Sequence, residues 1–95
     1  MLVLWTRPSL ADVEGLQDFT ATDNPSAAGT LVHALFDGTE EFLSTNPHAG
    51  RKSRVPGTRE LVLSGIPFIV ADRVTERVEI LAVVHSARDW PKDFT

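Results

Sequence analysis

The chain has 95 residues, of which 42% are hydrophobic and 23% charged, with a net charge of −4 and no cysteine. This composition is typical of one folded domain over residues 1–95, and it excludes disulfides, thiolate metal sites and cysteine nucleophiles. The longest apolar runs, Ile66–Ala71 and Ile80–Val84, are far shorter than the ~20 residues that span a membrane, so no membrane association is expected.

The first half of the chain predicts a strand and two helices. Leu2–Trp5 is a short apolar strand. A helix follows from Pro8 to about Thr22, because apolar residues recur there every three positions: Leu10, Val13, Leu16 and Phe19. The second helix begins after Asn24, a good N-cap, and ends before Pro47. The short link between the two helices predicts an antiparallel helix hairpin.

The second half predicts a loop and three strands. His48–Gly57 is the loop, and the strands are Arg59–Leu63, Phe68–Val74 and Val78–Val84. The fold class is therefore α+β: an N-terminal strand, a helix hairpin and a three-stranded antiparallel meander, forming one small twisted sheet with helices on one face. The last strand is apolar on both faces, which predicts a central position and leaves its second face for the C-terminal tail or a partner to cover.

Charge is divided unevenly along the chain. Residues 1–48 carry one base and seven acids, a balance of −6, whereas residues 49–95 carry eight bases and six acids, a balance of +2. Four of the bases fall in one nine-residue window: Arg51, Lys52, Arg54 and Arg59. This window is either a solvated loop or a face for an acidic partner. Because the whole chain is acidic, we do not expect it to grip nucleic acid unaided.

Motifs that carry chemistry are few. The three histidines, His33, His48 and His85, are far apart and show none of the spacings typical of a metal site. No nucleophile elbow or complete phosphate-binding loop is present. We therefore expect neither a metal nor a cofactor.

The amino-acid sequences of five segments together resemble the RelE/ParE toxin family, and they are more similar to the ParE branch than to the RelE branch. They follow one another in the family's order and cover nearly the whole chain: residues 23–28 (DNPSAA), 46–51 (NPHAGR), 54–62 (RVPGTRELV), 66–74 (IPFIVADRV) and 78–91 (VEILAVVHSARDWP). The resemblance implies the toxin of a type II toxin–antitoxin pair, neutralised by a ParD-like or RelB-like antitoxin. It also implies contact with DNA only through the antitoxin complex.

Members of the family have one of two activities, and the sequence of this chain leaves both possible. ParE-like members poison DNA gyrase, whereas RelE-like members cut messenger RNA on the ribosome. Tyrosine is absent, Asp72 stands where the family usually has tyrosine, and Ala82 stands where it often has arginine. These departures weaken a cationic site for RNA cleavage and favour gyrase as the target. A third hypothesis is that the chain is a weakened member of the family, which retains only antitoxin binding.

The basic window and the two-sided apolar last strand suggest a groove for an apolar, acidic segment of the antitoxin. Arg51, Arg54 and Arg59 are therefore the candidates for antitoxin binding, and the resemblance adds candidates for target binding. Arg88 and Trp90, near the C-terminus, are the candidates for target binding. No catalytic residue is assigned, but in a nuclease the residues to test are His85, Lys52 and Arg54. A cytoplasmic location follows from either target.

Overall fold

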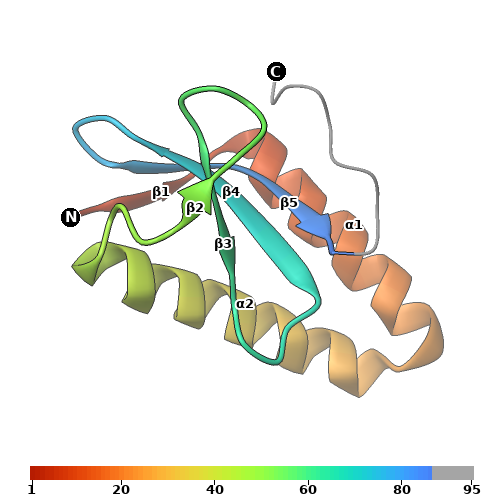
Figure 1. Ribbon diagram of the computed structural model, residues 1–95. Coiled ribbons are helices and arrows are strands. Elements are labelled where there is room, and N and C mark those ends of the chain that lie inside the picture. Colours follow the sequence, from red (N-terminus) through yellow and green to blue (C-terminus); the bar gives the residue numbers. More distant parts are fainter. Residues whose placement is uncertain (87–95) are drawn as a thin grey trace.

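The computed structural model describes residues 1–86, which form two helices and five strands (Figure 1). In chain order these are β1 (Val3–Trp5), α1 (Arg7–Asp23), α2 (Pro25–Thr45), β2 (Arg51–Lys52), β3 (Arg59–Val62), β4 (Phe68–Val74) and β5 (Val78–His85). The predicted α+β class and the order of its elements are confirmed.

Local capping explains where the helices begin and end. The Thr6 hydroxyl accepts a hydrogen bond from the backbone N–H of Ser9 at the start of α1, and Pro8 occupies the first turn. Asn24 serves both helices: its N–H donates to the carbonyl of Thr20, and its side chain accepts from the N–H of Ala27. One residue therefore ends α1 and starts α2, so the link is shorter than the sequence predicted.

Only half of the apolar stripe predicted on α1 is buried in the core. Val13 and Leu16 are buried, but Leu10 and Phe19 are 44% and 64% exposed. Steps of three residues turn about 300° around a helix of 3.6 residues per turn, so each successive position drifts by about 60°. The two outer members of the stripe have therefore rotated away from the core.

The sheet has the strand order β1-β5-β4-β3-β2. β1 is parallel to β5, whereas β2, β3, β4 and β5 are successively antiparallel. The predicted interior position of the last strand is confirmed, because β5 lies between β1 and β4. The sequence missed β2, which lies within the predicted loop and pairs Arg51 with Glu60 and Lys52 with Arg59. Two charged residues carry no apolar alternation, so nothing local identified them as a strand.

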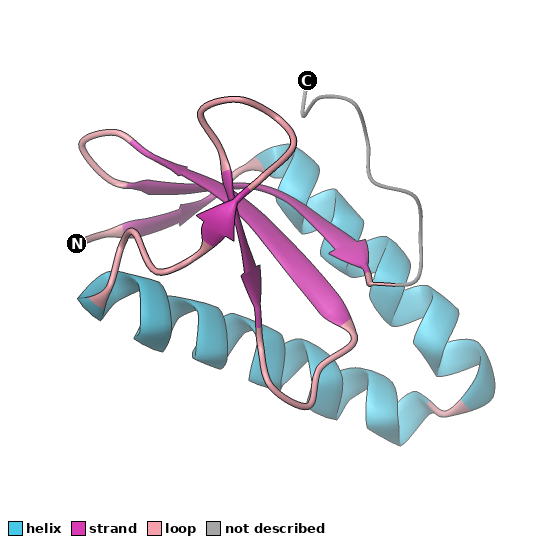
Figure 2. Cartoon of the chain, viewed as in Figure 1, coloured by secondary structure: helices cyan, strands magenta, loops and turns pink. Residues whose placement is uncertain are grey.

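Both helices lie on one side of the sheet (Figure 2). Leu61, Val70 and Val83 are cross-strand neighbours on the helix-facing side, and all three are buried in the core. α2 supplies Leu35 and Leu43, both fully buried. Among residues 1–86 there is no helix with the length and apolar character needed to cross a membrane.

α1 also protects an edge of β5. β1 pairs with β5 only as far as Ile80, so the next part of that edge has no strand beside it. There the carboxylate Oδ2 of Asp12 accepts a hydrogen bond from the backbone N–H of Val83 at 3.0 Å. This bond satisfies an edge donor close to the irregularity that separates Ala71 and Asp72 in the β4–β5 register.

Candidate functional site

The basic window forms the hairpin of β2 and β3 at one edge of the sheet. Its loop is closed by three hydrogen bonds: Ser53 N–H to the Thr58 carbonyl, and both the N–H and the hydroxyl of Thr58 to the Val55 carbonyl. Gly57 turns the chain with φ of +78°, a conformation that favours glycine. The loop therefore presents its charged side chains from an ordered turn.

Arg51 and Arg59 are held by other groups of the hairpin. The Nε of Arg51 lies 2.7 Å from Oε1 of Glu60, whose side chain is only 11% exposed. The guanidinium of Arg59 donates to the carbonyl of Gly50 at 3.0 Å. Lys52 and Arg54 are exposed at the surface. The three residues predicted to bind the antitoxin therefore lie in one hairpin: Arg51, Arg54 and Arg59. Strand alternation nevertheless places Arg51 and Arg59 on opposite faces of the sheet.

Asp72 lies beside this hairpin but not on its surface. It is the cross-strand partner of Arg59, it is fully buried, and neither carboxylate oxygen has a hydrogen-bond partner among the described residues. Burial raises the pKa of Asp72 to about 6, although the positive charge of Arg59 acts in the opposite direction. Alternation along β4 places Asp72 on the helix-facing side with Phe68 and Val70. The sequence placed this carboxylate near a phosphate site, but the structure buries it away from solvent.

The face of the sheet opposite the helices carries an apolar row. Val62, Ile69 and Val84 are direct cross-strand neighbours on β3, β4 and β5. Val62 is 54% exposed, and the other two are partly exposed. We call these three residues the aliphatic row. Side-chain alternation along β3 and β4 identifies Val62 and Ile69 in the sequence, because each follows a buried residue. Strict alternation along β5 would place Val84 in the core with Val78 and Ile80, and the register irregularity between β4 and β5 turns it to this face instead.

Small and paired side chains occupy the rest of this open face. Ala71 and Ala82 are neighbours beside the aliphatic row and form a flat floor. Two ion pairs flank that floor: Arg51 with Glu60, and Arg73 with Glu79, whose Nε and Oε1 are 2.7 Å apart. Because both side chains are methyl groups, the floor itself offers no charge. The open face suits an apolar segment bordered by acidic and polar groups.

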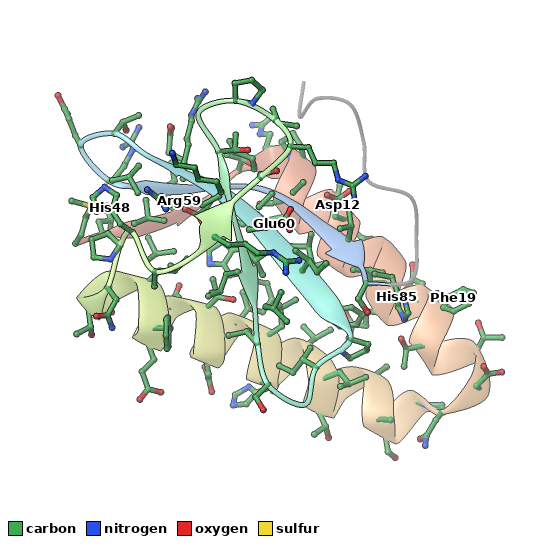
Figure 3. The ribbon with its side chains drawn as sticks, viewed as in Figure 1. Asp12, Phe19, His48, Arg59, Glu60 and His85 are labelled. Atoms are coloured by element: carbon green, nitrogen blue, oxygen red, sulfur yellow. The ribbon has the colours of Figure 1, made fainter. Side chains whose placement is uncertain are left out.

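The candidate nuclease residues are not brought together. His85 lies at one end of the sheet, paired with Phe68, and their ring centroids are 6.1 Å apart. Lys52 pairs with Arg59, which in turn pairs with Asp72 at the other end of β4. Asp72 follows Phe68 by four steps of extended chain, which corresponds to a distance of about 13 Å. Figure 3 shows His85 and Arg59 well apart.

The other predicted sites are located as follows. Arg88 and Trp90, proposed for target binding, lie outside the described residues. His33 is on the exposed side of α2, where its Nε2 is 2.9 Å from Asp37. Within residues 1–86 no group of three or more histidines and carboxylates is placed to hold a metal ion.

Comparison with known proteins identifies the family. A profile of the family described as "ParE toxin of type II toxin-antitoxin system, parDE" matches residues 3–90. The chain is 36% identical over 90 residues to "Putative toxin Y4kP" of Sinorhizobium fredii, a match that covers 95% of this chain and 93% of that protein. It also superimposes with a TM-score of 0.81 on a chain of the chromosomal ParDE system of P. aeruginosa, at 31% identity, covering 90% of this chain and 95% of the other. The open face and the basic hairpin therefore belong to a member of the ParE toxin family of type II toxin–antitoxin systems.

Proposed function

We propose that this ParE-family toxin acts by inhibiting DNA gyrase and is neutralised by a ParD-like antitoxin. The observation that carries the choice of target is the separation of His85 from Lys52 and Arg54. Family membership supports the toxin role, and the open face supports a target other than RNA. Gyrase as the target places the action in the cytoplasm.

RNA cleavage makes demands that the open face does not meet. A base must take the proton of the 2′-hydroxyl, an acid must serve the leaving oxygen, and cations must surround the phosphate. These groups act only within hydrogen-bond reach of the reacting atoms. Here the floor of the open face is Ala71 and Ala82, and the two cations that flank it, Arg51 and Arg73, are already paired with Glu60 and Glu79.

The antitoxin would bind the aliphatic row and the basic hairpin together. An apolar segment that covers Val62, Ile69 and Val84 would bury side chains that are now partly exposed. Acidic residues of the same segment would meet Arg51, which its pairing with Glu60 places on this face, and Arg54 in the adjoining loop. Arg59 lies on the helix-facing side, because it pairs with Asp72. Such a segment folds as it binds, which is typical of recognition by short flexible peptides.

The gyrase contact is assigned to Arg88 and Trp90, as the family resemblance implies. An arginine and a tryptophan close together are typical of the residues that contribute most to binding energy. This assignment concerns residues outside the described part of the chain, so its test is functional.

The test is a pair of assays with the purified toxin. We expect the toxin to inhibit supercoiling of relaxed plasmid by gyrase, and the Arg88→Ala variant to lose inhibition while its melting temperature stays within a few degrees of wild type. A purified translation system should show no cleavage of messenger RNA. Cleavage that His85→Ala abolishes would overturn the proposal and make the toxin a ribonuclease. Inactivity in both assays, with antitoxin binding retained, would identify a weakened family member.

A further inference from the structure

The free edge of β1 faces an acidic side of α2 across an open groove. Met1, Leu2 and Val3 line the groove on the strand side, and Asp37, Glu40, Glu41 and Ser44 line it on the helix side. The N-terminal ammonium of Met1 joins the two sides by donating to the Ser44 carbonyl at 2.9 Å. The volume is about 560 Å³. Figure 1 shows the start of β1 beside the C-terminal half of α2. The groove lies at the β1 edge of the sheet, opposite the edge formed by β2.

The strand side offers unpaired backbone groups. β1 ends the sheet, so only β5 is hydrogen-bonded to it. The Leu2 carbonyl accepts from Val78, and the Thr6 N–H donates to Ile80, so the even-numbered residues face β5. Backbone direction alternates along a strand, and the N–H and C=O groups of Val3 and Trp5 therefore point to the free edge. Within residues 1–86, no hydrogen bond outside the ladder uses these groups.

The helix side offers negative charge at helical spacing. Glu40 and Glu41 follow Asp37 by three and four residues, which places both on the side of α2 that carries Asp37. Asp37 is within 2.9 Å of His33, whereas no ion pair joins Glu40 or Glu41 to another of residues 1–86. Leu2 is 66% exposed and adds apolar surface at the same place. The groove is open and polar, which fits a peptide better than a small apolar ligand.

We infer that this groove is a docking site for an extended, basic segment of another protein, which adds a strand to β1 and places lysine or arginine side chains against Glu40 and Glu41. Backbone pairing with Val3 and Trp5 supplies the register, and the carboxylates supply the selection for positive charge. The inference is independent of the proposed gyrase target, and its charge preference is opposite to that of the basic hairpin.

The probe for this site is a synthetic peptide that alternates lysine and valine, titrated into the isotope-labelled toxin. We expect shifts of the backbone amide signals of β1, together with slower hydrogen exchange at Val3 and Trp5. The same peptide with glutamate in place of lysine should not bind. Glu40→Gln combined with Glu41→Gln should weaken binding of the lysine peptide roughly fivefold, as expected for the loss of two exposed ion pairs. Glu14→Gln combined with Asp18→Asn removes two exposed charges from α1 and should leave binding unchanged.

Three results would overturn the inference. Equal weakening by the α1 control variant would mean unspecific attraction to an acidic protein. Binding without protection of Val3 and Trp5 would mean that no strand is added at this edge. Sedimentation that shows self-association of the toxin, lost in the Glu40→Gln, Glu41→Gln variant, would mean that a second copy of the chain occupies the groove.

Discussion

Asp72 should make the toxin less stable as the pH rises from 4 to 7. Its carboxylate is fully buried without a hydrogen-bond partner, and its pKa is raised from 3.8 to about 6. The folded state therefore binds this proton more tightly than the unfolded state does. The stabilisation from protonated Asp72 is complete below about pH 4 and is lost as the pH rises through about 6. A difference of about two pKa units corresponds to about 3 kcal/mol, because each unit is worth about 1.4 kcal/mol.

The assay is urea unfolding of the wild type and of Asp72→Asn at pH 4 and pH 7. The asparagine side chain does not titrate and resembles the protonated carboxyl in size. We expect the two proteins to be similar in stability at pH 4, and the variant to be more stable at pH 7 by about 3 kcal/mol. The difference between the two proteins at each pH cancels the contributions of the histidines. Asp18→Asn, which changes an exposed acid of α1, is the matched control and should follow the wild type at both pH values.

Two outcomes would refute the reasoning about Asp72. If the wild type and Asp72→Asn lose stability in parallel between pH 4 and 7, burial does not raise the pKa of this carboxyl. If the wild type gains stability relative to the variant as the pH rises, attraction to Arg59 exceeds the cost of burial, and the two residues form a stabilising ion pair.

The other predictions concern an edge bond, a close backbone approach and the basic hairpin. Asp12→Ala should lower the free energy of unfolding by about 1.5–3 kcal/mol, since it leaves a β5 N–H without its charged acceptor, and Asp12→Asn should cost less. Gly50→Ala should cost roughly 1–3 kcal/mol, because the new Cβ would lie 2.9 Å from a β3 carbonyl oxygen. The new Cβ of Gly15→Ala would meet nothing within 4 Å, so this change should stabilise α1 by up to about 1 kcal/mol. Urea unfolding measures the stability of the Asp12, Gly50 and Gly15 variants. Equal effects of the two glycine changes would contradict the close approach of Gly50 to the β3 backbone. Arg54→Glu should weaken the antitoxin complex and reduce its salt dependence, measured by titration calorimetry at two salt concentrations, whereas Arg77→Glu makes the same charge change in an exposed turn and should not.

Much of the candidate site was visible in the sequence. The charged window marked the four bases, although the sequence predicted a loop there and not the β2–β3 hairpin. The residue patterns of the five segments identified the family. Both signals are properties of neighbouring residues. The aliphatic row was only partly visible, since strand alternation places Val62 and Ile69 outside the core but places Val84 with the buried Val78 and Ile80. The register irregularity between β4 and β5 moves Val84 to the other face. The separation of His85 from Lys52 was not visible in the sequence either, because proximity across a sheet depends on register, and register depends on the whole set of buried faces.

Local chemistry determined the helices, the central strands and their order along the chain. The N-caps at Thr6 and Asn24, and the apolar patterns of the later strands, act over a few residues and need no distant partner. Contacts between distant segments decided the rest. β1 became parallel to β5 through pairs such as Thr6 with Ile80, β2 formed only against β3, and Asp72 was buried because helices cover its side of the sheet. Burial and strand pairing are satisfied only by the assembled sheet, so no single segment of the sequence specifies them.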